Sequence, residues 1–168
     1  MGSGKSTVAR ILGAELGWPV IEVDDLIVKR AGVGTVGEIF SNSGEKVFRE
    51  LEAEIIKEVA ELDNVVISPG GGVVVDNMNV KALRSGAEAV FCFLDTSFAT
   101  IKHRISESAI NRPLFQDEAA ALTRFQERLP KYREVADMTV ATDGLTPGEV
   151  VAQIKHLLMD SLRSLIFF

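Results

Sequence analysis

Cysteine is nearly absent from this 168-residue chain, and long apolar runs are absent altogether. The single thiol, Cys92, excludes a framework of disulfide bonds and leaves a zinc site without a ligand set. Cys92 lies within the apolar run 90–94, where we expect it to be buried and unreactive. No stretch approaches the roughly 18 apolar residues of a membrane-spanning helix, and none has the pattern of a secretory signal, so we expect a cytoplasmic protein without a membrane partner.

Positive charge is also in short supply. The sequence has 18 lysines and arginines against 24 aspartates and glutamates, which gives a net charge of −6. Proteins whose main partner is nucleic acid are usually basic, so we expect no nucleic-acid partner here. The composition, 46% hydrophobic and 25% charged, is ordinary for a globular protein, and the length predicts one domain over residues 1–168.

The first motif is MGSGKST, residues 1–7, which matches the end of the phosphate-binding pattern G-x-x-x-x-G-K-[ST]. In this loop, glycines let backbone N–H groups close on phosphate oxygens, the lysine reaches the β and γ phosphates, and the hydroxyl binds Mg²⁺. Gly4, Lys5 and Ser6 fall at these positions. The first glycine of the pattern and its preceding strand would lie before Met1, and we expect both upstream. A merely flexible glycine-serine start is the alternative.

Helical and strand periodicities alternate along the chain, which favours an α/β fold with a parallel sheet. Helices are predicted over residues 5–16, 26–30, 36–40, 45–62, 78–83, 98–105 and 119–134, and from Pro147 onward. Strands are predicted over residues 18–23, 64–68, 89–94 and 138–141.

The longest predicted helix carries one apolar stripe. Arg49 and Glu52 fall outside this stripe and are expected to face away from the core. Its members are spaced by three or four residues: Val47, Leu51, Ile55, Val59 and Leu62.

Residues 106–118 are polar and lack periodicity. Loops of this length in compact domains are usually functional, and we expect this one to be a lid over the nucleotide.

Two carboxylates, Glu22 and Asp24, lie at the end of the predicted strand 18–23. Ligands of parallel α/β sheets bind at the carboxyl ends of the strands. One carboxylate can therefore serve Mg²⁺ and the other a substrate hydroxyl, which are both tasks of a kinase site. The alternative is that Asp24 or Asp25 only caps the following helix.

Three arginines, Arg49, Arg112 and Arg128, stand in settings unlike an ordinary helix surface. Their planar guanidinium groups suit carboxylates and phosphates. For any one of them a solvated helix face is the alternative, as for Arg49 with Glu52 three residues later.

Three consecutive glycines, residues 70–72, follow the predicted strand 64–68. Such a run is costly in backbone entropy, so we expect another group to approach the backbone closely there. A purely structural turn is the alternative.

Taken together and in this order, several segments resemble the shikimate kinases. The segments are residues 1–7, 23–27, 38–40, 43–45, 48–52, 65–74, 111–114 and 128–137. The resemblance implies ATP-dependent phosphorylation of the 3-hydroxyl of shikimate to shikimate 3-phosphate, in aromatic amino-acid (chorismate) biosynthesis. It also implies a monomer with a three-layer P-loop kinase fold: a five-stranded parallel sheet, its first strand absent from this chain, helices on both faces, a substrate-binding region over about 25–62, and a lid.

The resemblance also implies roles for individual residues, with ATP and Mg²⁺ as cofactors. The catalytic residues would be Lys5, Asp24 and Arg112, and the metal-binding residues Ser6 and Glu22. The nucleotide would contact Gly2, Ser3, Gly4, Lys5, Ser6, Thr7, Arg104 and Arg112. Shikimate would contact Asp24, Arg49, Gly70, Gly71, Gly72 and Arg128. One departure is Glu22, because the family often has aspartate there.

Two other functions stay open at this stage. Gluconate kinase also has a Gly-Ser-Gly-Lys-Ser loop, but it does not predict the motif at 48–52, the triple glycine and Arg128 together. A catalytically silent nucleotide-binding module is the alternative from a different class.

Overall fold

The computed structural model describes residues 2–85, 89–106 and 117–166. The α-helices are α1 (Lys5–Leu16), α2 (Val23–Ala31), α3 (Val36–Ala60), α4 (Asn77–Ser85), α5 (Phe98–Ser106), α6 (Glu118–Val135) and α7 (Pro147–Ile166). The strands are β1 (Val20–Glu22), β2 (Val66–Ser68), β3 (Cys92–Asp95) and β4 (Met138–Ala141), and a 3₁₀ turn, η1, spans Val73–Val75. Within these described stretches, no helix combines the length and apolar character needed to cross a membrane.

The strands form two parallel pairs. β1 pairs with β2, with Ile21 opposite Ile67, and β3 pairs with β4, with Leu94 opposite Val140. In the part of the chain that the structure describes, β2 has no partner besides β1, and β3 has none besides β4. The single five-stranded sheet therefore stays a prediction.

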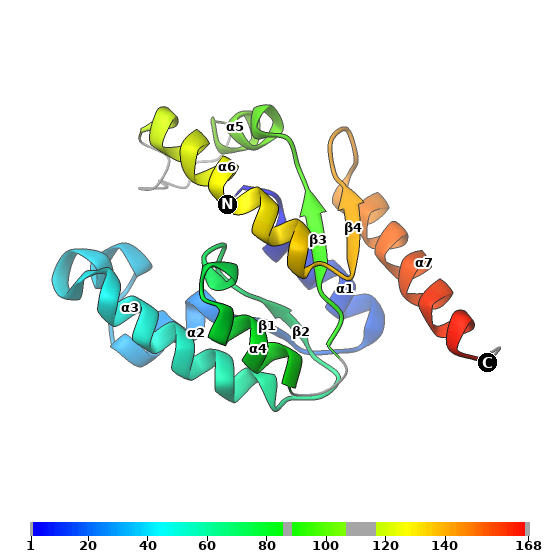
Figure 1. Ribbon diagram of the computed structural model, residues 1–168, viewed down its shortest axis with the longest axis horizontal. Coiled ribbons are helices and arrows are strands. Elements are labelled where there is room, and N and C mark those ends of the chain that lie inside the picture. Colours follow the sequence, from blue (N-terminus) through cyan, green and yellow to red (C-terminus); the bar gives the residue numbers. More distant parts are fainter. Residues whose placement is uncertain (1, 86–88, 107–116, 167–168) are drawn as a thin grey trace.

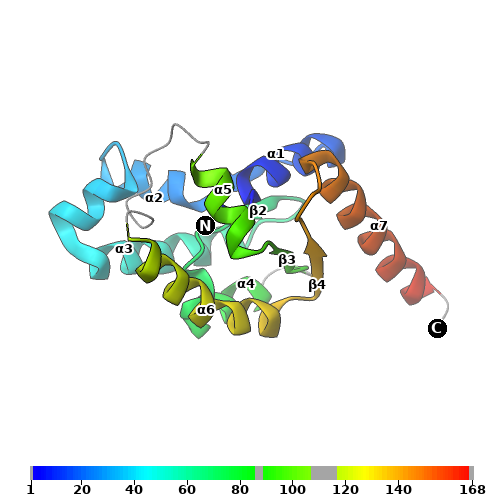
Figure 2. The ribbon, with the colours of Figure 1, turned by 90° about the horizontal axis from the view of Figure 1, so that it is seen from above.

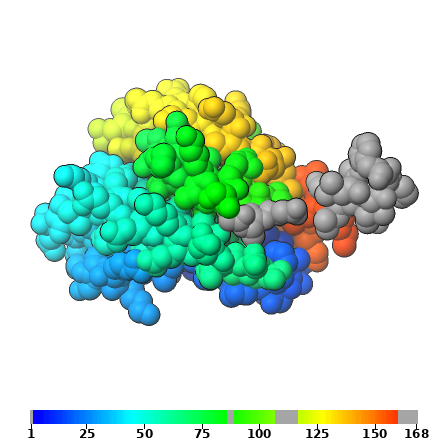
Figure 3. Space-filling view, turned by 60° about the horizontal axis from the view of Figure 1, so that its bottom comes forward, coloured from blue at the N-terminus to red at the C-terminus, as the bar shows by residue number. Residues whose placement is uncertain are grey.

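Helices cover both faces of the strands. Figure 2 shows α1 on one side of them and α4 and α6 on the other, and α1 packs against α7. Figure 1 shows β1 and β2 beside α2, α3 and α4, and β3 and β4 beside α7. In the space-filling view, α2, α3 and α4 form one continuous face next to α6 (Figure 3).

Two apolar clusters stabilise this arrangement. The larger one joins α2, α3 and α4 through fully buried side chains such as Ile27, Ile55 and Ile56. The smaller one joins β4 and α7 through Val140 and Val151. The site described below lies where α1, α2, α3 and α6 come together around the loop after β2.

Helix α3 contains a break at Gly44, whose φ of 82° lies in the left-handed region that favours glycine. The predicted apolar stripe is confirmed at its centre, where Ile55 and Val59 are buried, and is wrong at its ends, where Val47 and Leu62 are exposed. Glu52 was expected outside the core and is fully buried.

The strand predicted over 89–94 is observed as Cys92–Asp95, and the helices predicted over 36–40 and 45–62 form one helix, α3. The end of the first strand is also corrected. The first strand ends at Glu22 and α2 begins at Val23, so Asp24 belongs to the first turn of a helix. This position suits an acidic residue because the N-terminal end of a helix is electropositive. Asp25 lies in the same first turn, so the alternative that these carboxylates stabilise the helix end stays open.

Cys92 was expected to be buried and is exposed. It is the first residue of β3, and the buried side chain of this strand is Leu94. Partial burial still raises the pKa of its thiol to about 11, so the thiol stays protonated near neutral pH.

The core of α3 gives a stability test. Ile55→Ala should lower the free energy of unfolding by about 2 to 5 kcal/mol, because it removes a fully buried side chain and leaves a cavity. Val47→Ala on the same helix is the control, with a loss under about 1 kcal/mol, since Val47 is exposed. Urea unfolding of the two variants checks this, and equal losses would contradict the assignment of the core.

Candidate active site

The phosphate loop leads directly into α1. Gly2 and Gly4 have φ values of 73° and 93°, in the region that only glycine enters at little cost, and helix α1 begins at Lys5. The first backbone N–H groups of a helix point outward and attract anions. A Cβ on Gly2 would lie 2.9 Å from Cγ2 of Ile101, so this glycine also lets the loop pack against α5.

Arg104 of α5 holds the phosphate loop in place. Its Nη1 donates to the carbonyl oxygen of Ser3 at 3.2 Å, and its Nη2 donates to that of Thr142 at 3.1 Å. The guanidinium group therefore joins the phosphate loop to the segment after β4.

The Ser6 hydroxyl donates to Oε2 of Glu22 at 3.0 Å. The second oxygen, Oε1, is buried without a hydrogen-bond partner, and Nη2 of Arg10 lies 3.6 Å from it. A buried carboxylate oxygen that accepts no hydrogen bond is a suitable ligand for a cation or a cation-bound water. The described residues contain no group of three or more His, Cys, Asp or Glu side chains that could hold a metal. A metal ion here would thus depend on phosphate oxygens and water for its other ligands.

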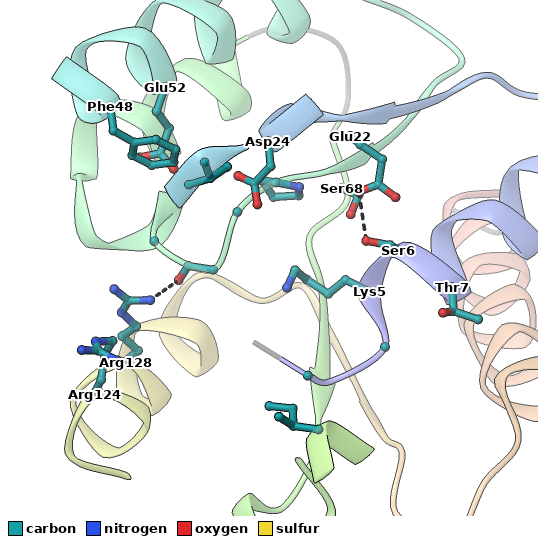
Figure 4. A pocket seen from close by; sticks show the side chains of 18 of the residues that line it. Lys5, Ser6, Thr7, Glu22, Asp24, Phe48, Glu52, Ser68, Arg124 and Arg128 are labelled. Carbon is teal, nitrogen blue, oxygen red and sulfur yellow. Dashed lines mark hydrogen bonds between the residues drawn. The ribbon is translucent and has the colours of Figure 1, made fainter. Parts of the chain in front are cut away.

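Asp24 faces the open pocket from the first turn of α2. The surrounding protein desolvates its carboxyl and raises its pKa, and the nearby Lys5 ammonium opposes this shift. Figure 4 shows Lys5 extending from the phosphate loop into the pocket, on the side where Asp24 lies. A base with a raised pKa accepts a proton more readily, which suits Asp24 for contact with a reacting hydroxyl.

Arg49 of α3 is positioned by two carboxylates. Its Nη1 donates to Oε2 of Glu52 at 2.8 Å, and its Nη2 donates to Oε1 of Glu45 at 3.0 Å. Burial raises the pKa of Glu52, while the charge of Arg49 lowers it. The other oxygen of Glu52, Oε1, is buried without a hydrogen-bond partner.

Two of the three glycines, Gly70 and Gly72, lie against these side chains. A Cβ on Gly70 would lie 2.7 Å from Oδ1 of Asp24, and a Cβ on Gly72 would lie 2.4 Å from Nη1 of Arg49. Both distances are far below van der Waals contact. The expected close approach to the backbone is confirmed, and the approaching groups belong to the protein itself.

Helix α6 contacts the same loop from another direction. Nη1 of Arg128 donates to the carbonyl oxygen of Gly71 at 3.2 Å, and the hydroxyl of Tyr132 donates to the same oxygen. Arg128 therefore lines the pocket with its guanidinium group oriented by the loop backbone.

One pocket of about 430 Å³ brings these parts together (Figure 4). Of the predicted site residues, Ser3 does not line it, although its carbonyl oxygen holds Arg104. Arg112, like the predicted lid residues 107–116, lies outside the described residues. The predicted site residues that line the pocket are Gly2, Gly4, Lys5, Ser6, Thr7, Glu22, Asp24, Arg49, Gly70, Gly71, Gly72, Arg104 and Arg128.

Three contributors were missed from the sequence: Glu52, Arg124 and Tyr132. Arg124, Arg128 and Tyr132 are four residues apart on α6, and this spacing puts them on one helix face. That signal was present in the sequence. For Glu52 the spacing from Arg49 was visible, but its complete burial depends on the packing of α3.

Comparisons with known proteins agree with this geometry. The family model described as shikimate kinase matches residues 1–159. The shikimate kinase of Moorella thermoacetica is 38% identical over 169 residues, covering 98% of this chain and 94% of that protein.

Solved structures give the same result. The shikimate kinase from Acinetobacter baumannii in complex with shikimate matches with a TM-score of 0.87 and 29% identity, over 96% of this chain and 89% of that one. The shikimate kinase from Bacteroides thetaiotaomicron matches with a TM-score of 0.82 and 32% identity, over 95% and 94%. The fold is thus the α/β P-loop kinase fold, and the chain belongs to the shikimate kinase family.

Proposed function

We propose that this chain transfers the γ-phosphoryl group of ATP to the 3-hydroxyl of shikimate, giving shikimate 3-phosphate and ADP in chorismate biosynthesis. One observation carries the proposal: a single pocket joins a phosphate loop to a glycine loop flanked by two arginines and an aspartate. The first half suits ATP, and the second suits a small acceptor with a carboxylate and hydroxyl groups.

In the reaction, the acceptor oxygen forms a bond to the γ phosphorus while the bond to the leaving ADP oxygen breaks. Asp24 orients the acceptor hydroxyl and takes its proton, and Lys5 balances charge on the β and γ phosphates. Arg49 and Arg128 bind the carboxylate of shikimate, and Gly70–Gly72 offer backbone N–H groups. The lid over residues 106–118, with Arg112 against the transferring group, stays part of the proposal.

Ser6 and Glu22 would hold Mg²⁺ at the phosphates. The buried Oε1 of Glu22, which accepts no hydrogen bond from the described residues and lies 3.6 Å from Nη2 of Arg10, supports this assignment. Glutamate is one methylene longer than the aspartate that the family often has at this position. We therefore propose that Glu22 contacts the ion through a water molecule rather than directly. When bound, Mg²⁺ supplies positive charge to the β and γ phosphates. We further propose that the protein works in the cytoplasm as a monomer.

An ADP-release assay with shikimate and gluconate side by side tests the activity. We expect turnover with shikimate, and the product should carry phosphate at the 3-hydroxyl. Turnover with gluconate alone would replace the proposal with the sugar-acid alternative. ATP binding without turnover of either acceptor would favour a silent nucleotide-binding module.

Arg128 gives a test of the carboxylate site. Arg128→Ala should weaken shikimate binding by about 2 to 4 kcal/mol, because it removes one partner of a charge-assisted pair, and should leave ATP affinity nearly unchanged. Calorimetric titration with each substrate measures both. Arg133→Ala is the control, since Arg133 lies on α6 but pairs with Asp95 at the surface. Undiminished shikimate affinity in Arg128→Ala would remove Arg128 from the site.

Asp24 gives a test of the proton acceptor. Only the ionised carboxylate accepts a proton, and its raised pKa means that it becomes protonated at a higher pH than an ordinary aspartate. The value of kcat/KM should therefore fall on the acid side with an apparent pKa above the usual aspartate range. Asp24→Asn should lower kcat by about 10²- to 10⁴-fold. Asp25→Asn is the matched control, and wild-type rates in Asp24→Asn would exclude the role.

A further inference from the structure

Arg124 is a pocket residue to which neither the sequence motifs nor the proposed reaction gives a role. It is half-buried on α6, one helical turn before Arg128, and it lines the same pocket. Figure 4 shows the two arginines next to each other on this helix. Residues four apart on a helix lie about 5 to 6 Å apart at their Cβ atoms, so two guanidinium groups can reach one ligand group.

The packing of Arg124 keeps its side chain close to the pocket. It also lines a small cavity of about 30 Å³ between α5 and α6, together with Phe98, Ile101 and Phe125. An arginine can bury its aliphatic stem against apolar groups while its charged end reaches polar surroundings. The apolar contact thus limits the directions in which the guanidinium group can extend.

The charges around the pocket favour an anion beside α6. Arg49 is paired with two carboxylates, Glu45 and Glu52, so much of its charge is balanced locally. Arg128 donates to a neutral carbonyl oxygen, that of Gly71. Arg124 and Arg128 thus place two basic side chains on the α6 side of the same pocket.

We propose that Arg124 acts with Arg128 as a second α6 contact for the carboxylate of the acceptor. This proposal rests on the proposed function. Together with Arg49, the two α6 guanidinium groups favour an anionic acceptor over an uncharged polyol of the same shape. Arg124 thereby contributes to acceptor specificity, and ATP binding does not require it.

Steady-state kinetics with shikimate and its methyl ester test this assignment. Arg124→Gln should raise the KM for shikimate about tenfold or more, because a hydrogen bond to a charged group is lost, and should leave the KM for ATP within about twofold. Arg124→Lys keeps the charge without the planar fork and should give an intermediate KM. Arg133→Gln, which removes the same charge elsewhere on α6, should behave as wild type.

The ester separates direct contact from a structural effect. Removing the negative charge of the acceptor should cost the wild-type enzyme more affinity than it costs Arg124→Gln, because the variant has already lost the contact. Equal costs in the two proteins would overturn the proposal, and so would an unchanged shikimate KM. A rise in the KM for ATP as large as that for shikimate would also overturn it, since Arg124 would then serve the nucleotide.

Failure of the two proposals can be told apart. A wild-type enzyme that does not phosphorylate shikimate overturns the proposed function and this inference with it. Wild-type turnover together with an unaltered Arg124→Gln variant overturns this inference alone. If Arg124→Gln does not fold, the Arg124→Lys variant and the ester comparison decide the question.

Discussion

The acceptor half of the pocket depends on how closely side chains approach the backbone at Gly70–Gly72. The carboxylate of Asp24 and the guanidinium group of Arg49 occupy the space that side chains at Gly70 and Gly72 would need. Arg128 and Tyr132 donate to the carbonyl oxygen between them. Three helices, α2, α3 and α6, are thus tied to one short loop, and the reactive groups are oriented before any ligand binds.

The basic side chains of the pocket are also oriented before a ligand binds. The protein is acidic overall, yet its pocket contains several basic side chains, and three of the arginines are held by groups of the protein. Arg104 is bound by two carbonyl oxygens and Arg49 by two carboxylates. Groups that are already oriented need little reorganisation when a charged ligand enters, so more of the interaction energy is available for binding and catalysis.

Much of this structure could be predicted from the sequence, because its local signals are strong. The stop signals after α1 and the periodicity of residues 138–141 predicted both elements within their observed bounds. The helical start at Val23, the burial of Glu52 and the exposure of Cys92 could not be predicted. Each depends on which elements pack together, and three- or four-residue spacing gives no account of that. Arg124 was missed for another reason, because an arginine on a helix usually faces solvent.

Substitution at Gly72 tests the central claim most directly, namely that close approach to the glycine loop positions the acceptor site. Gly72 has an ordinary φ of −93°, so alanine fits the backbone and only Arg49 has to move. Gly72→Ala should raise the KM for shikimate about ten- to a hundredfold, as expected for a displaced charged hydrogen-bond donor, with ATP affinity and folding retained. Gly148→Ala, where a Cβ meets nothing within 4 Å, is the control. Unchanged shikimate kinetics in a folded Gly72→Ala enzyme would contradict the account.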